Sequence, residues 1–325
     1  MPIDKKKVSV VMCTYNGEKY LKEQIESIIN QTYPIYELII QDDCSKDKTM
    51  DILRNYEKEY ANIHVFQNEK QKGVNENFFS AIIRITGDYI AISDQDDIWE
   101  LDKIEQQISY VDDYILVSCI SKPFSSDDKV KINFDERKVN FRLEREIYLN
   151  MLPGHTMLFN KSLIEKIPET IYWQNYLTYD HVIALVAAAH NSIVHIPQVL
   201  VNHRRLIQSV SYTEPINYKK TFSNLFRLAG RTFVQYCRLR HKMKTHFRRL
   251  YRFLEKIDVS SEEKKNAMTL AHYHSKHTLT GYLGLAILCI QLRKILFYAE
   301  EKNAIFSILR AIYFPISCSD YFRYL

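Results

Sequence analysis

Three carboxylates follow a short apolar run in the segment IAISDQDDIW, residues 90–99. They belong to Asp94, Asp96 and Asp97, and like charges this close to one another repel. A divalent ion that prefers oxygen ligands, such as Mg²⁺ or Mn²⁺, would relieve the repulsion and leave coordination sites for phosphate oxygens. In the alternative interpretation the loop is solvated and Asp97 caps a helix that begins near Ile98. The two interpretations are compatible, and the pattern leaves both open.

The elements that precede and follow this loop alternate between strand-like and helical periodicity. We expect strands at residues 7–13, 36–41, 62–67, 88–93 and 114–119, and helices at 18–31, 47–59, 75–86 and 99–111. This alternation predicts an α/β fold: a doubly wound, mainly parallel sheet with helices on both faces. Such sheets bind ligands beyond the carboxyl ends of their strands, where polar and acidic residues stand in this sequence.

The pattern changes beyond residue 120. There we expect a loop at 121–140, strands at 154–160 and 192–197, and a helix at 172–190. From about residue 215 onward the periodicity is helical. We therefore expect an α/β domain at 1–214 and an α-helical C-terminal region at 215–325.

The composition is that of a globular protein with a sizeable core. Apolar residues make up 46% and charged residues 26% of the 325 residues, with only seven Gly and eight Pro, which argues against disorder. The six cysteines form no close pair, so we expect a reducing compartment. The N-terminus lacks the pattern of a signal peptide, and the longest apolar stretch, at 281–292, is too short to span a bilayer.

Basic residues are concentrated in one segment. Residues 219–256 hold twelve Lys or Arg and a single acidic residue, Glu255, in a chain whose net charge is +5. Nucleic-acid binding is disfavoured because no recognised nucleic-acid module accompanies the segment. Two alternatives stay open: a helix whose basic face meets the more acidic remainder of the chain, or an interfacial helix on an anionic membrane.

Several motifs together resemble family 2 glycosyltransferases with the GT-A fold. They are VSVVMCTYNGEKYL, ELIIQDDCSKDKT, KGVNENFFSAI and GDYIAISDQDDIWELDKI, in that order over about the first 110 residues. GHTMLFNKSLI, YDHVIALVAAAH and HRRLIQSVS extend the resemblance to about residue 211. The SDQDDIW motif resembles bacterial members that build surface polysaccharides, especially those that transfer rhamnose.

The resemblance implies roles for individual residues of the first two strand ends and of the acidic loop. Thr14, Tyr15 and Asp43, with Asp42 adjacent, would hold the base and ribose of a nucleotide-sugar donor. Asp94 and Asp96 would form the DxD motif, which holds Mn²⁺ or Mg²⁺ on the donor diphosphate.

Four positions further along the chain also receive an expectation. Asp180, in TYDH, falls where these enzymes keep their catalytic base, and a single base implies inversion at the transferred sugar. The alternative is that Asp180 only caps the helix that follows it. Arg204 would contact the diphosphate or the acceptor. His155 and His181 are not expected to bind a metal, because neither has the spacing of a zinc ligand.

The sequence departs from the family pattern at several points. Cys44 replaces a usual Gly, so the turn there is expected to differ, and Leu206 and Ile207 replace a common His-Gly pair. The QxxRW motif of processive synthases is absent, which favours one sugar per acceptor visit.

The expected function is an inverting, metal-dependent transfer of one sugar, from dTDP-rhamnose or a UDP-hexose, to a glycan acceptor. We expect that acceptor to be lipid-linked and the protein to lie peripherally on the cytoplasmic face of the cell membrane. A nucleotidyltransferase is an alternative, but CTYNGEKY offers only Gly17 and Lys19 for a phosphate loop. A non-catalytic nucleotide-sugar-binding protein is another, and the oligomeric state stays open.

Overall fold

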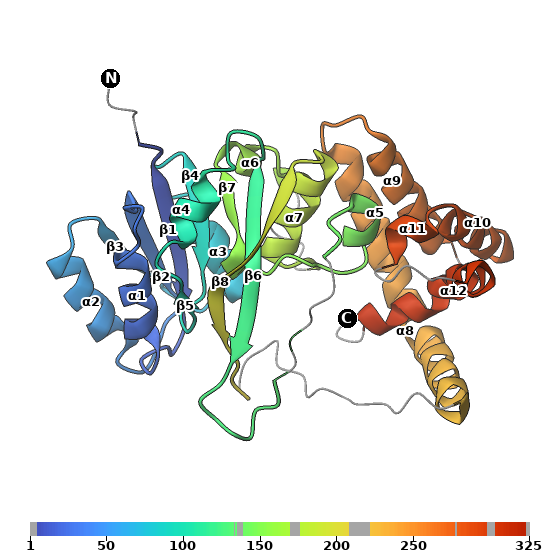
Figure 1. Cartoon of the computed structure of the whole chain (residues 1–325), viewed down its shortest axis with the longest axis horizontal. Helices are drawn as coiled ribbons and strands as arrows, with labels where there is room; N and C mark the ends of the chain where they lie inside the picture. Colours follow the sequence, from blue (N-terminus) through green and yellow to red (C-terminus); the bar gives the residue numbers. More distant parts are fainter. Residues whose placement is uncertain are drawn as a thin grey trace. The chain divides into compact units, whose positions relative to one another are not determined.

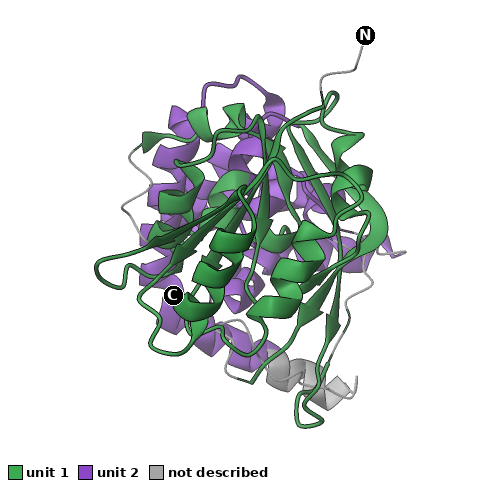
Figure 2. Cartoon of the chain, turned by 90° about the vertical axis from the view of Figure 1, so that its left-hand side faces the viewer, with its two compact units in different colours: residues 1–135, 152–183, 192–215 green, residues 136–151, 184–191, 216–325 purple. Residues whose placement is uncertain are grey.

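The computed structural model describes residues 5–132, 134, 139–169, 176–207, 222–276, 278–297 and 303–322. These fall into two compact units that interleave along the chain (Figure 2). Unit 1 comprises 1–135, 152–183 and 192–215, and unit 2 comprises 136–151, 184–191 and 216–325. The expected boundary between 1–214 and 215–325 lies outside the described residues, so that division stays a prediction.

Unit 1 is built on an eight-stranded sheet in the order β3-β2-β1-β4-β7-β6-β8-β5 (Figure 1). The strands are β1 (Val8–Thr14), β2 (Glu37–Asp42), β3 (Ile63–Gln67), β4 (Tyr89–Ser93), β5 (Ile98–Trp99), β6 (Leu116–Phe124), β7 (Leu158–Asn160) and β8 (Ile193–Arg204). The pairs among β3, β2, β1 and β4 are parallel, as is β6 with β8, whereas β7 and β5 run antiparallel to their neighbours. The expected mainly parallel α/β sheet is confirmed.

The direction of the chain across this sheet reverses beside β1. The helices that connect its parallel strands are α1 (Leu21–Ile29), α2 (Thr49–Glu59) and α3 (Val74–Ile82). The chain moves outward from β1 to β3 and then returns past β1 to β4, so right-handed crossovers place α1 and α2 on one face and α3 on the other. The carboxyl ends of β1 and β4, which pair directly, therefore border the switch point at which open sheets bind ligands.

Burial explains why the strands read as near-continuous apolar runs. Val8, Val10 and Met12 of β1 are fully buried and belong to one core with Leu21 and Ile25 of α1. A parallel strand covered on both faces has no exposed side on which polar residues could alternate. Polar side chains are therefore concentrated at the strand ends, where the site lies.

The structure corrects the expectation of a helix from residue 99. Ile98 and Trp99 form β5, which pairs with Asn202 and Val201 of β8, and the helix that follows is α4 (Lys103–Ile108). Asp97 therefore caps no helix. The physical reason is that Trp99 buries its ring and β5 gains ladder hydrogen bonds from β8, which outweigh the helical periodicity.

Other elements differ from the expectations mainly in length. The expected loop at 121–140 begins later, because β6 continues to Phe124 along β8. Only the end of the expected strand at 154–160 is a strand, preceded by the short 3-10 helix η1 (Gly154–Thr156), and α6 (Ser162–Glu165) follows it. The helix expected at 172–190 corresponds to α7 (Tyr179–Ala189). Residues 172–175 of the expected range lie outside the described part of the chain.

Unit 2 is helical, as expected for the C-terminal region. Its helices are α5 (Leu143–Glu146), α8 (Phe222–Lys256), α9 (Glu262–Ser275), α10 (Leu279–Gln291), α11 (Arg293–Leu296), α12 (Ala304–Ser317) and the 3-10 helix η3 (Cys318–Phe322). An aromatic cluster forms part of its core, in which Tyr148 and Phe247 pack against His274, Phe314 and Phe322. No described helix of the chain is both long and apolar enough to cross a membrane.

Candidate active site

One buried carboxylate fastens the acidic loop after β4 to strand β8. Oδ1 of Asp97 accepts hydrogen bonds from Nδ1 of His203 and from the backbone N–H of Arg204, both at 2.9 Å. Burial acts to raise the pKa of the Asp97 carboxyl, but His155 and His203 outweigh it, so the pKa lies below its ordinary value. Asp97 is therefore an ionised buried group that fixes where the loop stands.

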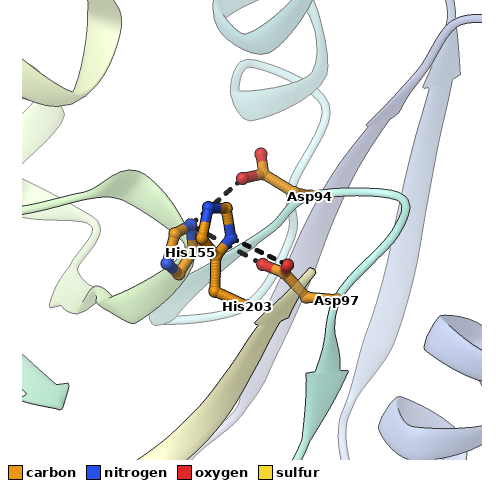
Figure 3. A group of neighbouring side chains, drawn as sticks. All are labelled: Asp94, Asp97, His155 and His203. Atoms are coloured by element: carbon orange, nitrogen blue, oxygen red, sulfur yellow. Dashed lines mark hydrogen bonds and ion pairs between the residues drawn. The ribbon is translucent and has the colours of Figure 1, made fainter. Parts of the chain in front are cut away.

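Three side chains gather around this carboxylate and form a four-residue cluster with it (Figure 3). One ligand atom from each of Asp94, Asp97, His155 and His203 lies within 4.8 Å of the others. Nδ1 of His155 donates to Oδ2 of Asp94 at 3.1 Å, and the two imidazole rings stack with their centroids 4.5 Å apart. On the far side of its ring, Nε2 of His203 accepts from Nη1 of Arg205 at 3.0 Å, which leaves the Nδ1 proton for Asp97. The acidic loop, η1 and β8 thus contribute to one cluster.

The cluster can hold a divalent cation once the Nδ1 atoms of His155 and His203 have released their protons. Oδ2 of Asp97 is buried without a hydrogen-bond partner among the described residues and lies 3.6 Å from Nδ1 of His155. Burial acts to lower the pKa of His155, but Asp97 and Asp94 raise it above the ordinary value. The geometry thus already attracts positive charge. Two carboxylates and two imidazoles suit a transition ion such as Mn²⁺ better than Mg²⁺, which prefers oxygen ligands alone.

Asp96 stands beside this group and is not a member of it. Burial, followed by repulsion from Asp94 and Asp97, raises the pKa of the Asp96 carboxyl to about 7. The expectation that Asp94 and Asp96 share the ion stays a prediction. His155, which the sequence analysis set aside, is one of the four, whereas His181 is not. No spacing along the chain could have revealed His155 and His203, because they stand on η1 and β8, which are far apart in the sequence.

Asp180 lies in the first turn of α7, where Oδ1 accepts the backbone N–H of His181 at 2.8 Å. Asn75 holds this turn at both ends: its Nδ2 donates to the Leu177 carbonyl, and its Oδ1 accepts from the backbone N–H of Tyr179. Burial is the largest cause that raises the pKa of the Asp180 carboxyl, and the nearby Asp94 adds to it. A carboxylate with a raised pKa is a better proton acceptor than an ordinary aspartate.

A tight contact joins the start of α7 to η1, which carries His155. A Cβ atom added to Gly154 would overlap the phenol of Tyr179, so a larger residue there would require that ring to shift. The ring of Tyr179 stacks on Phe78 with centroids 3.9 Å apart. The residue before Asp180 is therefore held from two sides, which fixes Asp180 near the four-residue cluster.

The carboxylates expected to hold the donor nucleotide are engaged within the protein. Oδ1 of Asp42 accepts from the hydroxyls of Thr14 and Ser45. Asp43 accepts from the backbone N–H groups of Lys72 and Gly73, at 2.7 and 2.8 Å. In this structure these groups order the loops after β1 and β2, and their contacts with a donor stay predictions.

The loop after β1 is tied to the acidic loop by a side-chain amide. Gln95 accepts from the backbone N–H of Tyr15 at 2.9 Å, and its Nε2 donates to the Tyr15 carbonyl at 3.1 Å. The Gln95 amide also fills the space a Cβ atom would need at Gly17. Sequence reasoning missed Gln95, which couples the predicted nucleotide loop to the predicted metal loop.

Arg204 is buried and fully occupied. Its Nη2 pairs with Glu23, its Nε donates to the Asp96 carbonyl at 2.8 Å, and its guanidinium stacks on the rings of Tyr20 and Phe124. These contacts position the acidic loop. The expected contact of Arg204 with a diphosphate or an acceptor stays a prediction. Cys44 adopts a φ of 65°, in the left-handed region that glycine occupies most easily.

Comparisons with known proteins agree with this geometry. Residues 9–167 match the sequence model of Glycosyl transferase family 2. The dTDP-rhamnosyl transferase RfbG of Shigella flexneri is 39% identical over 102 residues, which cover 30% of this chain and 35% of RfbG. The UDP-Glc:alpha-D-GlcNAc-diphosphoundecaprenol beta-1,3-glucosyltransferase WfgD of Escherichia coli is 37% identical over 102 residues, covering 31% and 40%. The chain spans 35% to 59% of the length of the curated relatives compared.

Solved structures share the fold. TarS 1-349 of S. aureus, in complex with UDP-GlcNAc, has a TM-score of 0.59 at 16% identity, covering 98% of this chain and 91% of that one. The mannosyltransferase PcManGT of Pyrobaculum calidifontis, in complex with GDP-Man and Mn²⁺, has a TM-score of 0.53 at 16% identity, covering 98% and 86%. The sheet is thus of the GT-A type, and residues 9–167 are similar in sequence to glycosyl transferase family 2.

Proposed function

We propose that this chain transfers a single sugar from a nucleotide-diphosphate donor to a glycan acceptor, with inversion at the transferred carbon. The observation that carries the proposal is the placement of Asp180 and the four-residue cluster at one switch point of the sheet. Asp94 belongs to the cluster and contributes to the raised pKa of Asp180, so the two features lie close enough to interact. A donor phosphate and an attacking hydroxyl need such neighbouring groups.

The residues that would hold a divalent ion are Asp94, Asp97, His155 and His203, with Asp96 beside them. When bound, Mn²⁺ or Mg²⁺ supplies positive charge that stabilises the diphosphate leaving group. The buried Oδ2 of Asp97 and the raised pKa of His155 support this proposal. Asp97 holds the loop, and Arg204 fixes the Asp96 carbonyl at 2.8 Å, so the carboxylates stay aligned before a donor arrives.

Asp180 would act as the catalytic base. The acceptor hydroxyl must lose a proton as its oxygen attacks the sugar carbon, and the Asp180 carboxylate would accept it. A single base acting directly on the acceptor predicts one displacement and therefore inversion. The lack of the QxxRW motif supports one sugar per acceptor visit.

The donor would lie against the loops after β1 and β2, with contacts from Thr14, Tyr15, Asp42 and Asp43. The two hydrogen bonds of Gln95 would hold the Tyr15 backbone at a fixed position relative to the acidic loop. We propose dTDP-rhamnose or a UDP-hexose as donor. The names of RfbG and WfgD, a dTDP-rhamnosyl transferase and a UDP-glucose-dependent glucosyltransferase, support these two choices.

The acceptor would be a lipid-linked glycan of a cell-surface polysaccharide, reached at the cytoplasmic face of the membrane. WfgD acts on a diphosphoundecaprenol-linked sugar according to its name, which supports a lipid carrier here. The basic segment 219–256 would contact anionic headgroups. Its first residues lie outside the described part of the chain, whereas α8 covers the rest.

A donor screen tests the proposed function. The full chain is incubated with Mn²⁺, a lipid-linked acceptor and each nucleotide sugar in turn, and release of nucleoside diphosphate is measured. Acceptor-dependent release from one donor, with the product in the inverted configuration, is the expected result. Release of pyrophosphate from a nucleoside triphosphate would instead indicate a nucleotidyltransferase. Donor binding without turnover on any acceptor would indicate a non-catalytic binding protein.

A further inference from the structure

Unit 2 presents a large apolar surface on two neighbouring helices. On α10, Leu279, Leu283 and Ile287 follow one another at intervals of four residues and are 75%, 51% and 58% exposed. Residues four apart lie on the same face of a helix, so these three form one stripe. We call this stripe and its continuation on α12 the apolar face.

The continuation on α12 has the same character. Ile305, Leu309 and Ile312 share one side of the helix, and Ile305 and Leu309 are more than half exposed. Phe306, beside them, is 61% exposed. Oη of Tyr282 on α10 donates to the Ile312 carbonyl at 2.9 Å, which ties the two stripes together. Figure 1 draws α10 and α12 beside one another. Contiguous exposed apolar patches of this kind mark interaction sites.

The charged residues within the helices that carry the apolar face, and within α11 between them, are basic, whereas Asp320 follows α12 in η3. Helices α10, α11 and α12 contain Arg293, Lys294 and Arg310 and no acidic residue. The N-terminal part of α8 adjoins α12, where Oη of Tyr313 donates to the Ala229 carbonyl at 2.9 Å. The exposed basic residues of α8 are Arg231, Arg238, Arg240, Lys242, Arg248, Arg249, Arg252 and Lys256.

We infer that the apolar face inserts into the hydrocarbon boundary of an anionic membrane, while the basic side chains of α8 meet the lipid headgroups. Aliphatic side chains on helices whose charged residues are Arg and Lys match an anionic bilayer in both polarity and charge. At 13 residues, α10 is about 20 Å long, so it would lie in the interface plane. The exposed stripes of α10 and α12 supply the apolar contact that the charge of the basic segment alone lacks.

The inference extends the proposed function and can be tested apart from it. Sedimentation of the full chain is measured, without donor or acceptor, with phosphatidylcholine vesicles that contain or lack phosphatidylglycerol. We expect binding to the anionic vesicles and much weaker binding to the neutral ones. The variant L279S/I305S/F306S/L309S should bind at least about 100-fold more weakly, because each of its four lost apolar contacts is worth roughly threefold or more.

A matched control and a second variant make the test decisive. I83S/L101S removes two apolar side chains of similar exposure from unit 1 and should bind as the original chain does. R231Q/R238Q/R240Q should lose the preference for phosphatidylglycerol and the salt dependence of binding. Circular dichroism and urea midpoints check that each variant folds, as exposed positions should allow.

Two outcomes would overturn the inference. If the fourfold serine variant is folded and binds anionic vesicles as tightly as the original chain, the apolar face does not insert. If the original chain ignores vesicles but self-associates, and the serine substitutions disperse it in analytical ultracentrifugation, the face is an interface between copies of the chain. Sugar transfer to a water-soluble acceptor is measured separately. A failure of the membrane inference can then be distinguished from a failure of the proposed function.

Discussion

The substitution Asp180→Asn separates a catalytic base from a structural cap. The carboxamide oxygen of Asn can still accept the backbone N–H of His181, which the carboxylate holds at 2.8 Å. Asn75 continues to bind the same turn through Leu177 and Tyr179. What the fold loses is one negative charge at a helix N-terminus, worth about 0.3–1 kcal/mol. The free energy of unfolding should therefore change by no more than about 1 kcal/mol.

The expected effect on the reaction is much larger. A positioned general base contributes about 10²–10⁴-fold to the rate, which corresponds to roughly 3–5 kcal/mol of barrier. Asp180→Asn should lower kcat by that factor and leave the affinity for the nucleoside diphosphate nearly unchanged. The assay is release of nucleoside diphosphate at saturating donor and acceptor, with calorimetric titration for affinity.

The pH dependence has a definite sign. A base must be ionised, and burial raises the pKa of Asp180 above its ordinary value. Activity of the original chain should therefore fall as the pH drops through that raised pKa, and the residual activity of Asp180→Asn should lack this limb. Asp102→Asn, at the start of α4, is the matched control and should leave kcat unchanged. If Asp180→Asn retains kcat within about threefold while folding and binding normally, Asp180 is only a cap and the proposed mechanism is refuted.

Three further predictions concern the groups around the site. Burial lowers the pKa of Lys103 to about 8, so the unfolded chain binds more protons between that pH and the ordinary lysine pKa. The free energy of unfolding, measured in urea, should therefore rise by about 2 kcal/mol from pH 7.5 to 9.5 because of Lys103. If the variant Lys103→Met shows the same rise, the low pKa of Lys103 is not its cause. Gln95→Ala removes both hydrogen bonds to Tyr15 and should raise the KM for the donor about tenfold with little change in kcat; an unaltered KM would argue against the coupling of the two loops. EDTA should abolish sugar transfer, and added Mn²⁺ should restore it. The variant His155→Ala should bind Mn²⁺ about 10–100-fold more weakly. If transfer survives EDTA, the ion has no part in the mechanism.

The sequence predicted the part of unit 1 whose elements alternate regularly. Strands β1, β2 and β4 carry buried apolar runs with Thr14, Asp42 and Asp94 at or just after their carboxyl ends, and parallel pairing places those ends at one edge. Periodicity is informative there because each strand is covered on both faces. The switch point then follows from the order of the strands.

The second half of the sheet could not be predicted in the same way. β5 has only two residues, Ile98 and Trp99, and exists because β8 offers it a partner from far along the chain. The same long-range pairing delivers His203 to Asp97, and η1 delivers His155. A contact between segments distant in the sequence produces no local hydrophobic periodicity. The four-residue cluster therefore could not be predicted from the sequence alone.

The carboxylates at the switch point divide by what surrounds them. The pKa of Asp97 is lowered, because two histidines compensate its burial, and that carboxylate holds the loop to β8. The pKa values of Asp96 and Asp180 are raised, because burial and the charge of Asp94 oppose their ionisation. Neighbouring acids whose environments push their pKa values apart take different roles. A buried anion that is already compensated serves as scaffold. The acids that lack such compensation are the ones that gain most from a bound cation or from a proton taken from an acceptor hydroxyl.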